Sequence, residues 1–348
     1  MKRHCRSRNY SWLPTGLAGA GLAAAAVLGT TALLVARRAR RAERDNPPTG
    51  RFLDIEGVHL HYLERGEGPP LVLLHGNGAM AWDFEISGIL GRLAQRYRVI
   101  AIDRPGFGHT NRPSSQTWTP TAQAELFHRA LIQLGIRQAI VVGHSWGALV
   151  ALSLALDHPA DVRGLVLLSG YYFPTLRADV VASLATAAPI LGDLLSYTVT
   201  PLLGRALRPR VFRKLFAPAA VPSRFETEFP TELSLRPSQL KASASETVLM
   251  TPSAAALAKR YGELKMPVII MAGRDDRIVD FAHQSEHLYE VLREATLIPF
   301  EGCGHMIHHV DPEKVVQGIS MVVNRSSRMA EGHSSPAYLR APATTKAD

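Results

Sequence analysis

Short apolar runs alternate with helical patterns along most of this chain, and this alternation restricts the possible folds more than any other feature. The runs LVLL at 71–74 and GLVLL at 164–168 contain no polar side chain, which is typical of strands covered on both faces. Strands that alternate with helices pair in parallel through crossover connections. The sequence therefore predicts an α/β fold with a mostly parallel sheet flanked by helices.

Eight strands and five helices are expected in this sheet domain. The strands are predicted at 51–55, 58–63, 71–74, 97–102, 139–142, 162–168, 268–271 and 295–299, and the helices near 82–95, 120–134, 146–157, 281–293 and 312–324. Only Glu56 and Gly57 separate the first two strands, which are expected to form a hairpin.

The alternation stops between about 175 and 265, where apolar residues keep a helical spacing. Prolines at 189, 201, 209, 218, 222, 230 and 237 are expected to cut this stretch into short pieces. It is predicted to be a helical cap inserted after the sixth strand. Within it, 202–216 carries five basic residues among Leu, Val and Phe. Either a solvated helix face or contact with an anionic membrane surface explains this pattern.

The N-terminal segment contains a long apolar stretch, Gly16 to Ala36, with no charge between Arg8 and Arg37. As a helix, 21 residues extend about 31 Å, close to the ~30 Å hydrocarbon core of a bilayer. A cleaved signal peptide has a shorter apolar region, and a buried soluble helix fits poorly between flanking arginines. An uncleaved single-pass anchor is predicted. The denser basic cluster after the span favours a cytoplasmic catalytic domain.

The formal charge of +9 is concentrated at the N-terminus, where residues 1–50 hold a net +7. Only +2 remains for the other 298 residues, so a nucleic-acid-binding face has little support. Two cysteines, Cys5 and Cys303, are too few for a disulfide framework or a thiolate zinc site.

These patterns divide the chain into five parts. They are an anchor with basic flanks at 1–44, a linker at 45–50, a core at 51–174 and 266–325, the cap at 175–265, and a tail at 326–348. The tail is rich in Ser, Ala, Pro and Gly and is expected to be disordered.

The stretch GHSWG at 143–147 lies between a predicted strand and a predicted helix. Gly-x-Ser-x-Gly in this setting indicates a nucleophile elbow, a tight turn that exposes the Ser145 hydroxyl at the carboxyl end of the sheet. The turn also places the Trp146 amide at a helix N-terminus, where an N–H group stabilises a developing oxyanion.

A serine nucleophile needs a base, and the base needs an orienting acid. In this architecture the acid and then the histidine follow the serine along the chain, each after a strand. AGRDDRIVD follows the seventh predicted strand and offers Asp275 and Asp276. EGCGHMIHH follows the eighth and offers three histidines: His305, His308 and His309.

Five motifs in this order resemble those of α/β-hydrolase-fold enzymes with a helical cap, a group that includes esterases, carbon–carbon bond hydrolases, epoxide hydrolases and haloalkane dehalogenases. The motifs are LLHGNG at 73–78, DRPGFGHT at 103–110, GHSWG, GRDDRIV and GCGHM, and the resemblance covers about 51–325. By this resemblance the acid lies three residues after the glycine, which implies Asp276, and GCGHM marks His305.

The resemblance also assigns roles. It implies that Ser145 is the nucleophile, His305 the general base and then acid, and Asp276 the group that orients the imidazole. The backbone amides of Asn77 and Trp146 are implied to form the oxyanion hole. Two further candidates, Tyr171 and Tyr172, follow the sixth strand and either line the substrate pocket or pack at the cap hinge. No metal or organic cofactor is implied.

Serine at the elbow favours attack on an acyl carbon, whereas epoxide hydrolases and haloalkane dehalogenases use aspartate there. The expected activity is hydrolysis of an apolar carboxylic ester or acyl lipid. A carbon–carbon hydrolase or a cofactor-free haloperoxidase-like activity uses the same triad and is the alternative. A non-catalytic binding protein of this fold is an alternative of another class. Substrate identity and oligomeric state are not determined by the sequence.

Two patterns point to other classes of site, and both are disfavoured. Gly76–Ala81 fits the dinucleotide pattern G-x-G-x-x-A, but it follows the third strand instead of the first. A metal site built from His305, His308 and His309 is disfavoured because no acid or cysteine pattern lies nearby. His75, His144, Asp103 and Arg104 are expected to have structural roles.

Overall fold

A computed structural model describes residues 15–176, 178–292 and 294–331. Its centre is one eight-stranded sheet with the strand order β1-β2-β4-β3-β5-β6-β7-β8. β2 is antiparallel to both β1 and β4, and all other neighbouring strands are parallel. The mostly parallel sheet predicted from the alternation is therefore confirmed. The strands are β1 Arg51–Ile55, β2 Val58–Arg65, β3 Pro70–Leu74, β4 Arg98–Ile102, β5 Ala139–His144, β6 Val162–Leu168, β7 Val268–Gly273 and β8 Thr296–Phe300.

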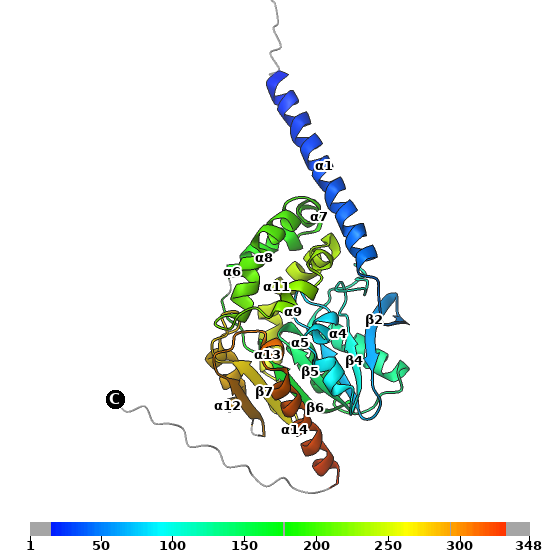
Figure 1. The fold of residues 1–348 in the computed structure, drawn as a ribbon, viewed down its shortest axis with the longest axis vertical. Helices are drawn as coiled ribbons and strands as arrows, with labels where there is room; N and C mark the ends of the chain where they lie inside the picture. Colours follow the sequence, from blue (N-terminus) through cyan, green and yellow to red (C-terminus); the bar gives the residue numbers. More distant parts are fainter. Residues whose placement is uncertain (1–14, 177, 293, 332–348) are drawn as a thin grey trace, which may run out of the picture.

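Helices cover both faces of the sheet (Figure 1). Along β3, Val72 and Leu74 pack into one hydrophobic cluster with α4 and α5, while Leu71 and Leu73 pack into a second cluster with α3 and α14. Burial of both faces explains why these strands are apolar without alternation. The flanking helices are α2 Trp82–Ile86, α3 Ile89–Leu93, α4 Pro120–Gln133, α5 Trp146–Asp157, α12 His287–Val291, α13 Ile307–Val310 and α14 Pro312–Ala330.

Two predicted helices differ from the structure. The stretch predicted as one helix at 82–95 forms α2 and α3, because Gly88 between them has a φ of 79°, which no right-handed helix accommodates. The stretch at 281–293 begins as a π-helix at Phe281–Glu286 before α12.

Between β6 and β7 the described residues form helices and connecting loops without a strand, and these helices lie above the carboxyl edge of the sheet (Figure 1). They are α6 Ala178–Ala187, α7 Pro189–Tyr197, α8 Val199–Phe216, α9 Ser223–Glu228, α10 Thr231–Ser234, α11 Pro237–Ala258 and a 3₁₀ turn at Tyr261–Glu263. Pro189 and Pro237 begin helices, where a missing N–H is harmless. Pro209, however, lies inside the 18-residue α8, so the expectation that it ends a helix is wrong.

α1 is one continuous helix, Thr15–Asp45, that projects away from the rest of the molecule (Figure 1). Near its end, Val35 and Ala42 are buried, and Glu43 forms a 2.9 Å ion pair with Arg236 at the start of α11. Earlier side chains such as Leu22 and Val27 are exposed. Among the described residues, α1 is the only individual helix that is long and apolar enough to cross a membrane. The helices α6 and α7 reach the same length and hydropathy only when they are taken together, and the pair is bent by 94°.

The boundaries of the terminal segments need correction. α1 continues through Asp45, so the predicted linker begins one residue later. At the other end, α14 continues to Ala330, and the prediction of disorder from 326 is wrong for its first five residues. Ser326 is buried there and its hydroxyl donates to the Val323 carbonyl oxygen at 2.8 Å. Residues 332–348 of the predicted tail and the basic flank at 2–8 lie outside the described residues.

Candidate active site

Ser145 stands in the turn between β5 and α5, with φ 54° and ψ −116°. This positive φ is uncommon for a residue with a side chain and marks local strain. The flanking glycines are required by close contacts. A Cβ on Gly143 would lie 2.4 Å from the Gly147 carbonyl oxygen, and a Cβ on Gly147 would lie 2.2 Å from the Leu74 carbonyl oxygen. The Gly-x-Ser-x-Gly pattern is therefore a packing requirement of this turn.

Asp276 follows β7 and His305 follows β8, so both reach the carboxyl edge of the sheet, where β5 presents Ser145. Asp276 Oδ2 lies 2.7 Å from His305 Nδ1, and both side chains are almost fully buried. The other carboxylate oxygen accepts backbone hydrogen bonds from Ile278 at 2.7 Å and Val279 at 3.0 Å. Three hydrogen bonds fix this carboxylate against the imidazole. Asp275 is exposed, so the contacts distinguish the two candidate acids.

His144 connects the elbow to the catalytic histidine candidate. Its ring lies 4.9 Å from the His305 ring, and its Nε2 lies 3.2 Å from the His305 carbonyl oxygen. Within the described residues the Ser145 hydroxyl makes no hydrogen bond with His305. In unliganded hydrolases this bond is often long and tightens when substrate binds. The structure thus pairs Asp276 with His305, and His144, the residue before Ser145, contacts His305.

The loop after β3 packs directly against the serine. A Cβ on Gly76 would lie 3.1 Å from the Ser145 Cβ. The backbone N–H groups of Asn77 and Trp146 donate no hydrogen bond to any described part of the chain. Two such free donors near the serine are what an oxyanion hole requires. The Asn77 side chain turns away toward α11, where its Nδ2 donates to the Ser243 carbonyl oxygen at 3.1 Å and to Thr247 Oγ1 at 3.0 Å.

The Arg104 side chain is completely buried and hydrogen-bonds the backbone of the loop after β3. Its Nε donates to the His75 carbonyl oxygen at 2.8 Å and its Nη2 to the Gly76 carbonyl oxygen at 3.0 Å. Its Nη1 forms an ion pair with Glu246 of α11. Burial and the nearby Arg104 charge lower the pKa of His75 to about 3. His75 is therefore neutral, and its Nε2 accepts from the Arg104 backbone N–H at 3.0 Å. The predicted structural roles of both residues agree with these contacts.

His308 and His309 do not join His305 in a metal site; both contact Asp83, a buried acid of α2. Their Nε2 atoms each lie 2.8 Å from one Asp83 oxygen. The expectation that no acid lies near these histidines is wrong, because Asp83 contacts both. It precedes His308 by 225 positions, so the local sequence does not reveal it. Burial raises the pKa of Asp83, but the two imidazoles outweigh this and hold it well below its ordinary value. The donor atoms lie within 4.8 Å of one another and are already engaged in hydrogen bonds among themselves.

The two tyrosines after β6 occupy different environments. Tyr171 lines a cavity of about 570 Å³ together with Ile278 and Val279, the residues whose amides hold Asp276. Tyr172 is enclosed, and its hydroxyl accepts from the Gly170 N–H at 3.2 Å. Its carbonyl oxygen accepts from the Tyr261 hydroxyl at 2.7 Å. These contacts favour a pocket position for Tyr171 and packing at the cap hinge for Tyr172.

The sheet, its flanking helices and the elbow define this protein as an enzyme of the α/β-hydrolase class. The chain belongs to the alpha/beta hydrolase fold family, whose sequence model matches residues 69–312. It is 29% identical over 228 residues to the haloalkane dehalogenase 2 of Mycobacterium bovis, covering 66% of this chain and 70% of the relative. It is also 29% identical over 286 residues to the 2-hydroxymuconate semialdehyde hydrolase of Pseudomonas putida, covering 78% and 93%.

Solved structures share the fold. One is a membrane phospholipase A described as a bacterial virulence factor, which matches with a TM-score of 0.58 at 22% identity and covers 90% of this chain and 98% of that one.

Proposed function

We propose that this protein is a membrane-anchored serine hydrolase that cleaves an apolar carboxylic ester or acyl lipid through an acyl-enzyme intermediate. The observation that carries the proposal is the placement of Ser145. It occupies a strained elbow at the carboxyl edge of the sheet, the edge that also carries the buried Asp276–His305 pair joined at 2.7 Å. A serine in that position is activated as a nucleophile without a metal.

In the proposed reaction, Ser145 Oγ attacks the ester carbonyl carbon while its proton passes to His305 Nε2. The Asp276 carboxylate holds Nδ1–H and stabilises the imidazolium. The free amides of Asn77 and Trp146 receive the oxyanion of the tetrahedral intermediate, where one such donor is worth about 10²–10³ in rate. His305 then protonates the departing alkoxide. Water then attacks the acyl carbon and gives a proton to the same nitrogen. The second tetrahedral intermediate breaks its bond to Ser145 Oγ, which takes that proton back from His305, and the acid leaves.

Haloalkane dehalogenase chemistry has less support despite that relative. A dehalogenase-type displacement needs an aspartate at the elbow, and this chain has Ser145 there. The Asn77 amide group, at a position used for halide binding in dehalogenases, is instead engaged with α11. Both observations favour acyl chemistry.

Exposed apolar side chains on the cap support a lipid substrate. Ile190 at the start of α7 is 88% exposed and Val181 on α6 is 71% exposed. Others on α6, α7 and α8 are about half exposed: Leu184, Leu191, Leu194, Val199, Leu202 and Leu203. Exposed apolar side chains concentrated on three consecutive helices are typical of a membrane or protein contact. α1 lies against α7, so the cap surface and the proposed anchor meet the same bilayer.

A carbon–carbon bond hydrolase is the second candidate, because the semialdehyde hydrolase of Pseudomonas putida is similar over most of its length. The same triad and oxyanion hole serve both reactions, so only substrate turnover separates them.

The first test treats the detergent-solubilised full chain with a fluorophosphonate probe and reads its intact mass, beside Ser145→Ala. One adduct on the unaltered chain and none on the variant is the expected result. No adduct on the folded chain would refute the activated serine. Fatty acid release from phospholipid vesicles then tests the substrate class. Flotation of the chain with vesicles at high salt tests the anchor, and recovery in the soluble fraction would contradict it.

A further inference from the structure

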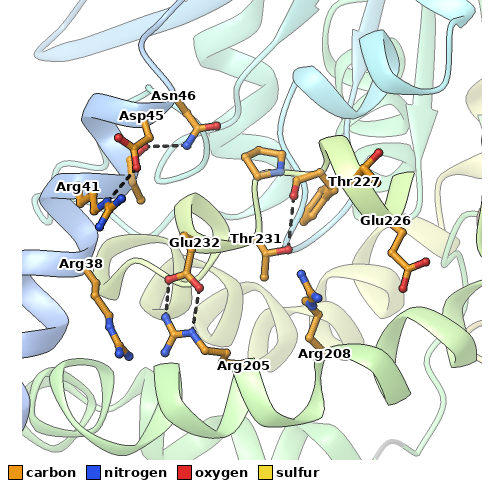
Figure 2. A pocket seen from close by; sticks show the side chains of 13 residues that line it. Arg38, Arg41, Asp45, Asn46, Arg205, Arg208, Glu226, Thr227, Thr231 and Glu232 are labelled. Atoms are coloured by element: carbon orange, nitrogen blue, oxygen red, sulfur yellow. Dashed lines mark hydrogen bonds and ion pairs between the residues drawn. The ribbon is translucent and has the colours of Figure 1, made fainter. Parts of the chain in front are cut away.

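A polar cavity of about 500 Å³ lies between α1 and the cap, apart from the triad. Figure 2 shows its lining, with arginines from α1 on one side and from α8 on the other. No residue that lines it belongs to the proposed catalytic machinery. We propose that this cavity binds the phosphodiester headgroup of a singly anionic glycerophospholipid, with phosphatidylglycerol as the probe. This inference rests on the proposed membrane anchoring.

The cavity lies just beyond the C-terminal end of the apolar span of α1. The apolar span ends at Ala36, and Arg38 and Arg41 follow two and five residues later. At about 1.5 Å per residue, they lie about 3 and 8 Å beyond the apolar span. The headgroup layer of a bilayer occupies about the same 5–8 Å outside the hydrocarbon core. Both arginines therefore lie at the level of lipid phosphates when α1 spans the membrane.

Four arginine side chains supply N–H donors to the lining of the cavity. Arg41 is paired with Asp45 at 3.2 Å, and Arg205 donates from Nε to Glu232 at 2.8 Å. Arg38 and Arg208, by contrast, make no hydrogen bond or ion pair with any described residue. A guanidinium presents several N–H donors in a planar fork that matches phosphate oxygens. Two such forks with no hydrogen bond or ion pair to a described residue line one cavity, although the Arg208 guanidinium also lies 5.8 Å from the centroid of the Phe212 ring.

The electrostatic field there is positive. The pKa of Glu232 lies below its ordinary value, mainly because Arg205 hydrogen-bonds it, and further because Arg38 and Arg208 act on the same carboxylate. The guanidiniums of Arg38 and Arg208 thus both act on the Glu232 carboxylate, and Figure 2 shows the Arg205–Glu232 pair between them.

The net charge of the lining selects the ligand class. Four arginines oppose three carboxylates, which leaves one excess positive charge. A single phosphodiester neutralises that charge, whereas a polyanion such as RNA or a polyphosphate would repel the acids. Glu226 forms no ion pair with the described residues and offers an acceptor for headgroup hydroxyl groups. A phosphate bound here would lie among arginines of both α1 and α8.

The test uses the full chain carrying Ser145→Ala in neutral detergent micelles, so that lipid is not hydrolysed. Calorimetry measures the Kd for short-chain phosphatidylglycerol, for phosphatidylcholine with the same chains, and for inorganic phosphate. We expect saturable binding of phosphatidylglycerol at one site. Adding Arg38→Ala and Arg208→Ala should weaken it by about tenfold or more, because two charge-assisted contacts are lost. Arg38→Lys with Arg208→Lys keeps the charge, lacks the fork and should bind with intermediate affinity.

The matched control is Arg96→Ala with Arg137→Ala. These exposed arginines precede β4 and β5, at the opposite edge of the sheet, and carry the same charge change. Equal weakening in this control, equal affinity for phosphatidylcholine, or no saturable binding would overturn the proposal. Displacement of the lipid by inorganic phosphate at the same concentration would identify a free-anion site instead and also overturn it. Hydrolysis by the chain with Ser145 intact is measured separately, so a failed hydrolase proposal leaves the binding result interpretable.

Discussion

Replacing Arg104 with methionine tests whether its buried ion pair with Glu246 of the cap supports the loop after β3, which contains His75 and Gly76. Both partners, Arg104 and Glu246, are completely buried. Methionine keeps much of the apolar volume but removes the charge and all N–H donors. Glu246 would retain only the Gln123 amide as a donor, at 2.9 Å. The His75 carbonyl would lose its donor, whereas the Gly76 carbonyl would keep the His75 Nδ1–H at 2.8 Å and the Ala79 N–H at 3.3 Å.

The expected effect is large. Removing one partner of a buried ion pair costs about 3–5 kcal/mol. The His75 carbonyl, left without its donor, adds about 1 kcal/mol. The predicted loss in free energy of unfolding is therefore about 4–6 kcal/mol, a large part of the total stability of a typical domain. Glu246→Leu should cost about as much as breaking the pair from the other side. The double variant should cost less than the sum by about 2 kcal/mol or more, since no buried charge is left unpaired.

Urea unfolding of the full chain in detergent, followed by circular dichroism, measures these differences. Arg224→Met is the matched control, because Arg224 pairs with Glu228 at the surface and is half exposed. Its expected cost is under about 1 kcal/mol. A similarly small loss for Arg104→Met, or strict additivity of the two buried substitutions, would refute the argument.

Three further predictions concern the elbow, the triad and pH. Gly147→Ala should abolish ester hydrolysis, because the new Cβ would lie 2.2 Å from the Leu74 carbonyl oxygen, whereas Gly262→Ala, where a Cβ meets open space, should not; p-nitrophenyl butyrate turnover distinguishes them. Asp276→Asn should lower kcat by about 10³–10⁴ with little change in KM, because His305 loses the acceptor that holds its tautomer; a change in KM alone would contradict this. Burial lowers the pKa of three histidines below the ordinary value of 6.5: His75, His144 and His308. Below that pH the unfolded chain takes up protons that the folded chain excludes. The free energy of unfolding should therefore decrease as the pH is lowered, by up to about 4 kcal/mol per pH unit. Urea midpoints that stay constant from about pH 7.5 to 5 would count against this prediction.

Much of the sheet is predictable because burial on both faces leaves a simple record in the sequence. Each predicted strand lies within two residues of its observed bounds, and β1 and β6 agree at both ends. The elbow is equally legible, since a strand, two glycines around Ser145 and an apolar helix are local features. Local patterns carry this information without reference to the rest of the chain.

Contacts between distant segments are where prediction fails. Asp83 precedes His308 by 225 positions, and Arg104 precedes Glu246 by 142. No periodicity links such pairs, because their meeting depends on how the cap and the helices pack. Pro209 shows the same limit. Alone it disfavours a helix, but the surrounding packing of α8 overrides that local preference.

The position of the cap in the sequence has a consequence during synthesis. β6 pairs with β7 through Leu165 and Val268, yet about 100 residues of cap are made between these two strands. At about 5–20 residues per second, β6 remains an unpaired sheet edge for about 5–20 s on the ribosome. An exposed apolar edge of this kind invites pairing with other chains. Asp276 and His305 follow the later strands, so a nascent chain holds Ser145 long before it holds the two residues proposed to activate it.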